Sequence, residues 1–97
     1  MREYEVTVLL QPKLDDEAQN ELLERITGLL THGDEEADQP VAHHWGRRNL
    51  AYLINDQKEG YYVHFEAKLE PGRIAQMERD FIYMDDVLRH LVVRKES

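Results

Sequence analysis

The residues best suited to binding chemistry lie in segment 45–52, whose sequence is WGRRNLAY. The segment is strand-like, so Arg47 and Arg48 should point to opposite sides of it. One guanidinium could then bind a phosphate while the other pairs with a carboxylate. Trp45 is the only tryptophan, and an indole beside a glycine suits either an interface anchor or a core position. We therefore expect a binding role for this segment.

The other residues that could do chemistry have ordinary structural explanations. His43 and His44 lie close in sequence to acidic residues 34–36, which raises the question of a metal site. Adjacent strand residues point to opposite faces, so we expect solvated loop residues there and no metal site. Paired acids fall where helix starts or turns are expected, the glycines are scattered singly, and the chain has no cysteine. We therefore predict that the protein is not an enzyme and needs no cofactor.

Charge is distributed unevenly along the chain. The formal net charge is −8, with 12 Lys and Arg against 20 Asp and Glu. Residues 15–38 hold nine acids and one base, so this segment accounts for the whole excess. Residues 47–54 and 87–95 contain basic residues and no acid. A positive surface therefore remains compatible with the composition, provided that the acidic segment faces elsewhere.

The length and composition favour one small domain covering residues 1–97. A chain of 97 residues with 41% hydrophobic and 33% charged residues suits a single core. No apolar run approaches the roughly 20 residues of a membrane span, and the first residues do not resemble a signal peptide. We expect a cytoplasmic protein that does not associate with membranes.

The hydrophobic pattern predicts six elements that would position these residues. Residues 3–10 alternate as a strand, and apolar residues from 14 to 30 recur at helical spacing, with Asp15 or Asp16 as the cap and Gly33 as the stop. An acidic loop, Asp34 to Gln39, should follow. The remaining predicted elements are a strand over 40–54 interrupted at Gly46, a turn over 55–60, a strand over 61–69, a helix starting at 70–72 and a strand over 87–94.

The order β-α-β-β-α-β predicts an α+β fold, the ferredoxin-like split β-α-β sandwich. This fold has a four-stranded antiparallel sheet with both helices on one face. In the second helix we expect Ile74, Met77 and Phe81 to form the buried stripe, flanked by Ala75 and Ile82. The other face of the sheet carries no helix, so it needs polar residues or a partner.

Three segments together resemble the bacterial small-subunit ribosomal protein S-six family over essentially the whole chain. They are MR-x-YE at the start, WGRR-x-LAY-x-I over 45–54, and DVLRH-x-VVR over 86–94. Two positions depart from the family pattern. Leu53 stands where a proline is usual, and His44 stands where an acid often precedes the tryptophan.

The resemblance implies a non-catalytic protein that binds the central domain (platform) of small-subunit rRNA. It also implies a partner, the small basic ribosomal protein S-eighteen, and a chain that is monomeric when free. Carried over by position, the expected rRNA-binding residues are Arg2, Arg47, Arg48, Arg89, Arg94 and Lys95. Those expected to face the partner, or else to lie in the core or at its edge, are Tyr4, Trp45 and Tyr52.

Two other interpretations stay open at this point. The first is a regulatory ferredoxin-like domain that homodimerises through its open sheet and binds a small effector. The second is a free-standing single-strand RNA binder, because the segment GYYVHF over 60–65 resembles the base-stacking strand of RNA-recognition domains. That binder would depend on Tyr62 or His64 rather than on Arg47 and Arg48.

Overall fold

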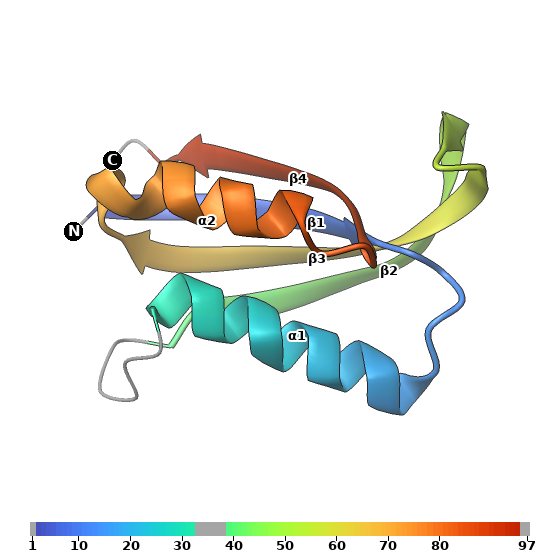
Figure 1. Cartoon of the computed structure of the whole chain (residues 1–97), viewed down its shortest axis with the longest axis horizontal. Helices are drawn as coiled ribbons and strands as arrows, with labels where there is room; N and C mark the ends of the chain where they lie inside the picture. The colour runs from blue at the N-terminus through green and yellow to red at the C-terminus, as the bar shows by residue number, and fades with distance from the viewer. Residues whose placement is uncertain (1, 33–38, 96–97) are drawn as a thin grey trace.

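The chain folds as a four-stranded antiparallel sheet with two helices on one face, as a computed structural model shows (Figure 1). The structure describes residues 2–32 and 39–95. The strand order is β2-β3-β1-β4, which confirms the predicted α+β sandwich. The elements are β1 (Arg2–Leu10), α1 (Asp16–Thr31), β2 (Val41–Ile54), β3 (Gln57–Leu69), a 3₁₀ turn (Pro71–Arg73), α2 (Ile74–Ile82) and β4 (Val87–Arg94).

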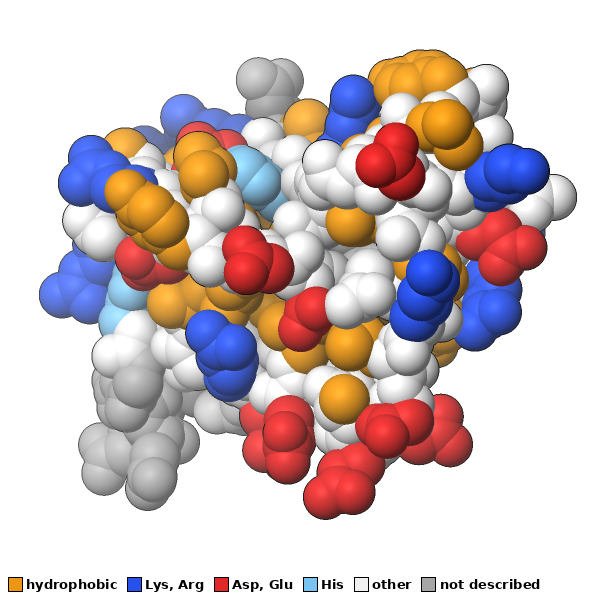
Figure 2. Space-filling model, turned by 45° about the vertical axis from the view of Figure 1, so that its right-hand side comes forward, with side chains coloured by type: hydrophobic (Ala, Val, Ile, Leu, Met, Phe, Trp, Pro, Cys, Tyr) orange, Lys and Arg blue, Asp and Glu red, His pale blue; other side chains and the backbone are white. Residues whose placement is uncertain are grey.

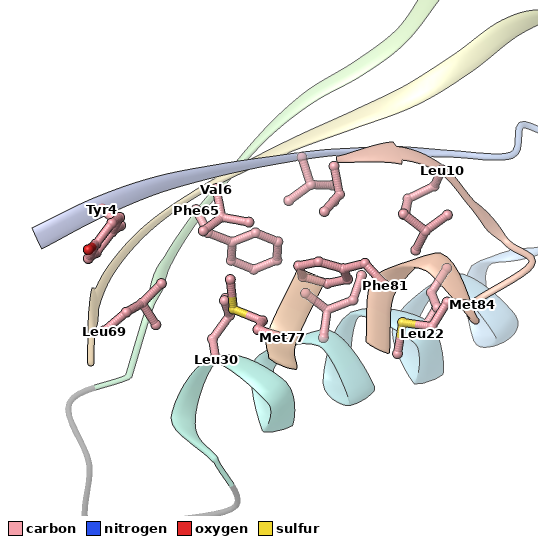
Figure 3. Close-up of a cluster of buried hydrophobic side chains, with 14 residues drawn as sticks. Tyr4, Val6, Leu10, Leu22, Leu30, Phe65, Leu69, Met77, Phe81 and Met84 are labelled. Atoms are coloured by element: carbon pink, nitrogen blue, oxygen red, sulfur yellow. The ribbon is translucent and has the colours of Figure 1, made fainter. Parts of the chain in front are cut away.

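The hydrophobic core lies between the two helices and one face of the sheet (Figure 3). Alternate residues of β1 and β3 enter it because successive side chains of a strand point to opposite faces. The fully buried large side chains are Phe65, Phe81, Leu10, Ile26, Leu69, Val6, Val8 and Val63. Since β1 and β3 are the two central strands, their core-facing residues are covered by both helices.

Helix α1 begins as its sequence predicts. The carboxylate of Asp15 accepts a hydrogen bond of 2.8 Å from the backbone N–H of Ala18, which caps the first turn. The helix ends at Thr31, and His32 adopts the left-handed conformation with φ 54°. The predicted stop at Gly33 and most of the predicted acidic loop, 34–38, lie outside the described residues.

The buried face of helix α2 contains fewer residues than expected. Met77 and Phe81 are buried and Ile74 is partly buried, as predicted. Ala75 and Ile82 are exposed instead of flanking the stripe, and Ile82 has 71% of its surface accessible. Each follows a stripe residue by one position, about 100° around the helix, which turns it away from the sheet.

The β2–β3 hairpin extends beyond the rest of the sheet. Strand β1 pairs with residues 61–69 of β3, so residues 57–60 and the facing part of β2 project past it (Figure 1). The connection is a two-residue turn at Asn55 and Asp56, both with positive φ, as a type I′ hairpin requires. The predicted turn over 55–60 is therefore too long, because these two residues alone reverse the chain.

Gly46 interrupts β2 as predicted. Its φ is 86°, and the register of β2 against β3 shifts between His44 and Gly46. A residue with a side chain would be strained in this left-handed conformation. The resulting bulge places an extra residue, Trp45, between the two paired positions.

Candidate interface on the open sheet face

The sheet face that carries no helix, called the open face here, has a polar and largely acidic centre. Thr7 pairs with His64 and Glu5 pairs with Glu66 across β1 and β3, at positions that alternate with the buried residues. Glu3 and Lys68 extend the same row. The edges of this face carry the apolar side chains of Val41, Tyr52, Leu91 and Val93, all exposed.

His64 and Trp45 form a stacked pair at the centre of the open face. Their ring centroids are 4.8 Å apart and the planes differ by 7°. The His64 Nδ1 atom lies 2.9 Å from the Thr7 hydroxyl, and Nε2 lies 3.8 Å from a carboxylate oxygen of Glu5. The His64 ring supports one face of the indole, while 49% of Trp45 stays accessible to solvent. This arrangement suits a pre-positioned interface anchor.

A groove of about 410 Å³ lies beside this pair, between the projecting hairpin and β4. The Arg89 guanidinium donates a hydrogen bond of 2.9 Å to the Tyr52 hydroxyl and lies 5.3 Å from the centre of that ring. This contact joins the two sides of the groove. Its lining includes Leu9, Leu50, Tyr52, Tyr62, Arg89 and Leu91. The groove is therefore largely apolar, with a guanidinium at one wall.

Arg47 and Arg48 point to opposite sides of β2, as their adjacency predicts. Arg47 faces the helix side, where Nη2 donates a hydrogen bond of 3.0 Å to the Pro12 carbonyl and Nη1 lies 3.6 Å from Glu59. Arg48 pairs with Gly60 and is exposed. Within the described ranges Arg48 has no ion pair, so its guanidinium is the one left available for a phosphate.

The other predicted rRNA-binding residues do not lie with this pair. Arg2 and Arg94 sit at the opposite end of the sheet, on its helix side. Leu9, the β1 residue that pairs with Arg89, lies seven positions after Arg2. Seven positions span about 24 Å along a strand. The six residues therefore form two groups at the two ends of the sheet, and tertiary structure does not merge them into one patch.

Lys95 is engaged by a carboxylate on the open face. Its Nζ lies 3.1 Å from Glu66 Oε1, and His43 Nε2 lies 2.9 Å from the other oxygen. The hydrogen bond from His43, and next the one from Lys95, lower the pKa of Glu66 below its ordinary value of 4.5. The hydrogen bond to Glu66 raises the pKa of Lys95 above 10.5.

The three residues expected at a partner surface separate into two kinds. Tyr4 has 8% of its surface accessible and belongs to the core, so the structure supports the core alternative for this residue. Trp45 and Tyr52 are exposed on the open face and at the hairpin, with 59% of Tyr52 accessible. The sequence singled out His64 only for the alternative single-strand RNA binder and did not single out Leu91 or Val93, although alternation along β3 and β4 places all three on this face.

His43 and His44 lie in β2 rather than in the solvated loop expected from the sequence. They do point to opposite sides: His43 contacts Glu66, whereas His44 Nδ1 lies 3.0 Å from the Tyr61 hydroxyl. No group of three or more potential metal ligands occurs within residues 2–32 and 39–95.

The acids of α1 lie on the side of the sheet away from the open face. Figure 2 shows acidic side chains gathered along the lower side of the molecule, where Figure 1 places α1. Asp16 and Glu17 of its first turn are exposed there. The acids of α1 therefore do not face Arg48, which lies on the open side of β2, whereas Arg47 is on the same side of the sheet as the helices.

These features define a class: a small ferredoxin-like sandwich whose helix-free sheet face carries aromatic anchors, apolar edges and arginines suited to binding macromolecules. Comparison with known sequences specifies the family. The family model described as "Ribosomal protein S6" matches residues 3–94. The chain belongs to the ribosomal protein S6 family and is a ribosomal protein of the small subunit, as the sequence resemblance predicts.

Individual relatives agree with this assignment. The chain is 36% identical over 96 residues to the small ribosomal subunit protein bS6 of Desulforudis audaxviator, which covers 99% of this chain and 100% of that protein. The crystal structure of a 30S ribosomal protein S6 from Thermotoga maritima shares the fold, with a TM-score of 0.82, 22% identity, and coverage of 97% of this chain and 87% of that one. A protein from Arabidopsis thaliana shares the fold more distantly, with a TM-score of 0.57, 10% identity, and coverage of 100% and 95%.

Proposed function

We propose that this protein binds the central domain (platform) of small-subunit rRNA together with ribosomal protein S-eighteen, and that it catalyses no reaction. In this proposal the free chain is a monomer and works in the cytoplasm, on the ribosome. Family membership supports the ribosomal setting. The rest of the proposal is carried by the division of the open face into an acidic centre and apolar edges.

The open face suits a basic protein better than an RNA backbone. Glu3 and Glu5 lie along its centre and would repel phosphates, whereas the Glu66 carboxylate is paired with Lys95. The exposed ring of Trp45 and the groove beside Tyr52 would contact apolar side chains of the partner, while the carboxylates would attract its lysine and arginine residues. A basic partner on this face would also supply phosphate-neutralising charge that a chain of net charge −8 lacks.

The RNA contacts then fall to arginines at the ends of the sheet. Arg48 is a candidate because it is exposed and, like Arg2 and Arg94, has no partner among residues 2–32 and 39–95. Arg2 and Arg94 would contact phosphates at the other end, and Arg89 would do so from the rim of the groove. Such contacts fix position and register and do not read bases. Arg47, Arg89 and Lys95 have intramolecular partners and would contribute less.

The deciding experiment is a salt-dependent binding titration with a central-domain rRNA fragment, with and without S-eighteen. We expect strong binding only when the partner is present, and a monomer when the chain is alone. Arg48→Ala should weaken the ternary complex, whereas Arg25→Ala, on the exposed surface of α1, is the charge-matched control. Absence of binding in both arms, together with a stable homodimer of the free chain, would overturn the proposal in favour of a regulatory domain.

A further inference from the structure

His64 is a largely enclosed side chain on the open face. Only 14% of its side chain is accessible, because Trp45 covers one side of the ring and the sheet lies beneath it. Its two nitrogens face Thr7 and Glu5 of the neighbouring strand β1. The orientation of the exposed indole is therefore set by a ring that is itself fixed from two directions.

Both protonation states of His64 are compatible with this arrangement. In the neutral ring Nδ1 accepts a hydrogen bond from the Thr7 hydroxyl, and Nε2–H faces Glu5. In the protonated ring Nδ1–H donates to the same hydroxyl oxygen, so the contact at 2.9 Å is kept. The added charge strengthens the interaction with the Glu5 carboxylate at 3.8 Å and with the indole face stacked at 4.8 Å.

The charged groups around His64 leave Glu5 as its counter-ion. From β2, His43 lies 6.2 Å away between ring centroids, but its Nε2 is engaged by Glu66. Glu66 of β3 is also bound by Lys95, which follows β4. The residue of β4 opposite Thr7 is Leu91, which carries no charge. The positive charge of a protonated His64 would therefore interact with the Glu5 carboxylate and with the ring of Trp45.

We propose that His64 is a positioning residue for Trp45, and that protonation of His64 makes the open face less receptive to its basic protein partner. The protonated ring pairs with Glu5 and places a positive charge in the centre of the open face, which weakens the attraction for a basic partner; the same charge also lies against the indole in a cation–π contact. The partner's affinity therefore falls as His64 becomes protonated. The effect on the partner rests on the proposed function, whereas the coupling of His64 to Trp45 does not.

The coupling is tested on the free chain, because Trp45 is the only tryptophan. Its fluorescence and the NMR shift of its indole N–H are followed from pH 8 to pH 5.5. We expect one sigmoidal change in the wild type and in His43→Gln, which removes the neighbouring imidazole, and a flat profile in His64→Phe, which keeps a stacking ring. If the wild type is flat, or if His64→Phe keeps the wild-type profile, the coupling is overturned. Should His64→Phe not fold, His64→Gln replaces it, with the same expected result.

The consequence for binding is tested with purified S-eighteen at pH 8 and at pH 5.5. We expect the wild type to bind roughly threefold to tenfold more weakly at the lower pH, and His64→Phe to change less than twofold, so that titration of the partner itself is controlled. If the wild type binds S-eighteen equally well at pH 8 and at pH 5.5, the proposed effect of His64 protonation on partner binding is overturned. The proposed function would not be affected by that result. Absence of binding at any pH would overturn the partner assignment, and the fluorescence result would still decide the coupling.

Discussion

Arg89 and Tyr52 are in contact although their strands form the two opposite edges of the sheet. The guanidinium donates a hydrogen bond of 2.9 Å to the Tyr52 hydroxyl and lies over its ring. The contact exists because the β2–β3 hairpin is longer than β1 and curls over the open face. The hairpin thus forms one wall of a groove whose other wall is β4.

Removing the Tyr52 hydroxyl should loosen the hairpin without unfolding the protein. In Tyr52→Phe the ring stays and the hydrogen-bond acceptor is lost, so the unfolding free energy should fall by less than about 1 kcal/mol. Backbone amides near the hairpin turn should exchange faster with solvent, as measured by hydrogen–deuterium exchange. Tyr83→Phe, at another exposed tyrosine, serves as the control. Unchanged exchange in Tyr52→Phe would show that the contact does not restrain the hairpin.

Arg47 and Arg48 should have separable effects. Arg48→Ala should remove one of the proposed phosphate contacts, so the negative slope of log K against log salt should become less steep by roughly 0.7–0.9 while stability stays within about 0.5 kcal/mol. Arg47→Ala loses the bond to the Pro12 carbonyl, so stability should fall by about 0.5–1 kcal/mol with little change in slope. RNA titrations at several salt concentrations and urea unfolding measure the two effects. The opposite assignment of slope and stability would contradict the structure.

The core assignment predicts large losses at two helix positions. Leu22→Ala in α1 and Phe81→Ala in α2 should each lower the unfolding free energy by roughly 2–5 kcal/mol, because each leaves a cavity between the helices and the sheet. Ile82→Ala, next to Phe81 but exposed, should cost less than about 0.5 kcal/mol. Urea denaturation compares the three variants. A similar loss at Ile82 and Phe81 would mean that α2 presents a different edge to the sheet.

The Glu66 contacts predict where stability changes with pH. The pKa of Glu66 is lower in the folded chain than its ordinary value of 4.5. The contribution of Glu66 to folding stability is therefore complete above pH 4.5 and is lost as the pH falls through the folded pKa. The pH dependence from Lys95 runs in the opposite direction, because its pKa is raised in the folded chain. The contribution of Lys95 to folding stability is complete below pH 10.5 and is lost as the pH rises through the folded pKa.

NMR titration of the Glu66 carboxyl carbon tests the cause of its lowered pKa. His43→Gln and Lys95→Met should each move the pKa of Glu66 back toward 4.5, because the hydrogen bond from His43 and next the hydrogen bond and charge of Lys95 are the causes that lower it. Glu24, an exposed acid of α1, is an internal control that should not respond. A Glu66 titration unaffected by either substitution would refute this account.

Much of the site could be predicted from local pattern. Two adjacent arginines on a strand must point to opposite sides, and Arg47 and Arg48 do so. The resemblance also identified the family correctly, because its three segments span the chain in order. The length of the hairpin turn was predicted less well, because Asn55 and Asp56 reverse the chain with positive φ, a conformation that composition alone does not specify.

The sequence by itself determined the fold, since alternation with period two and apolar spacing of three to four residues fix which faces of strands and helices must be buried. It also determined which strand residues share a face. Only the tertiary structure decided which basic residues have partners. Arg47 meets Pro12 and Arg89 meets Tyr52 across 35 and 37 residues of chain, and Glu66 meets Lys95 across 29. Such long-range contacts depend on strand order, register and the curl of the hairpin, none of which is contained in the local pattern that defines each element.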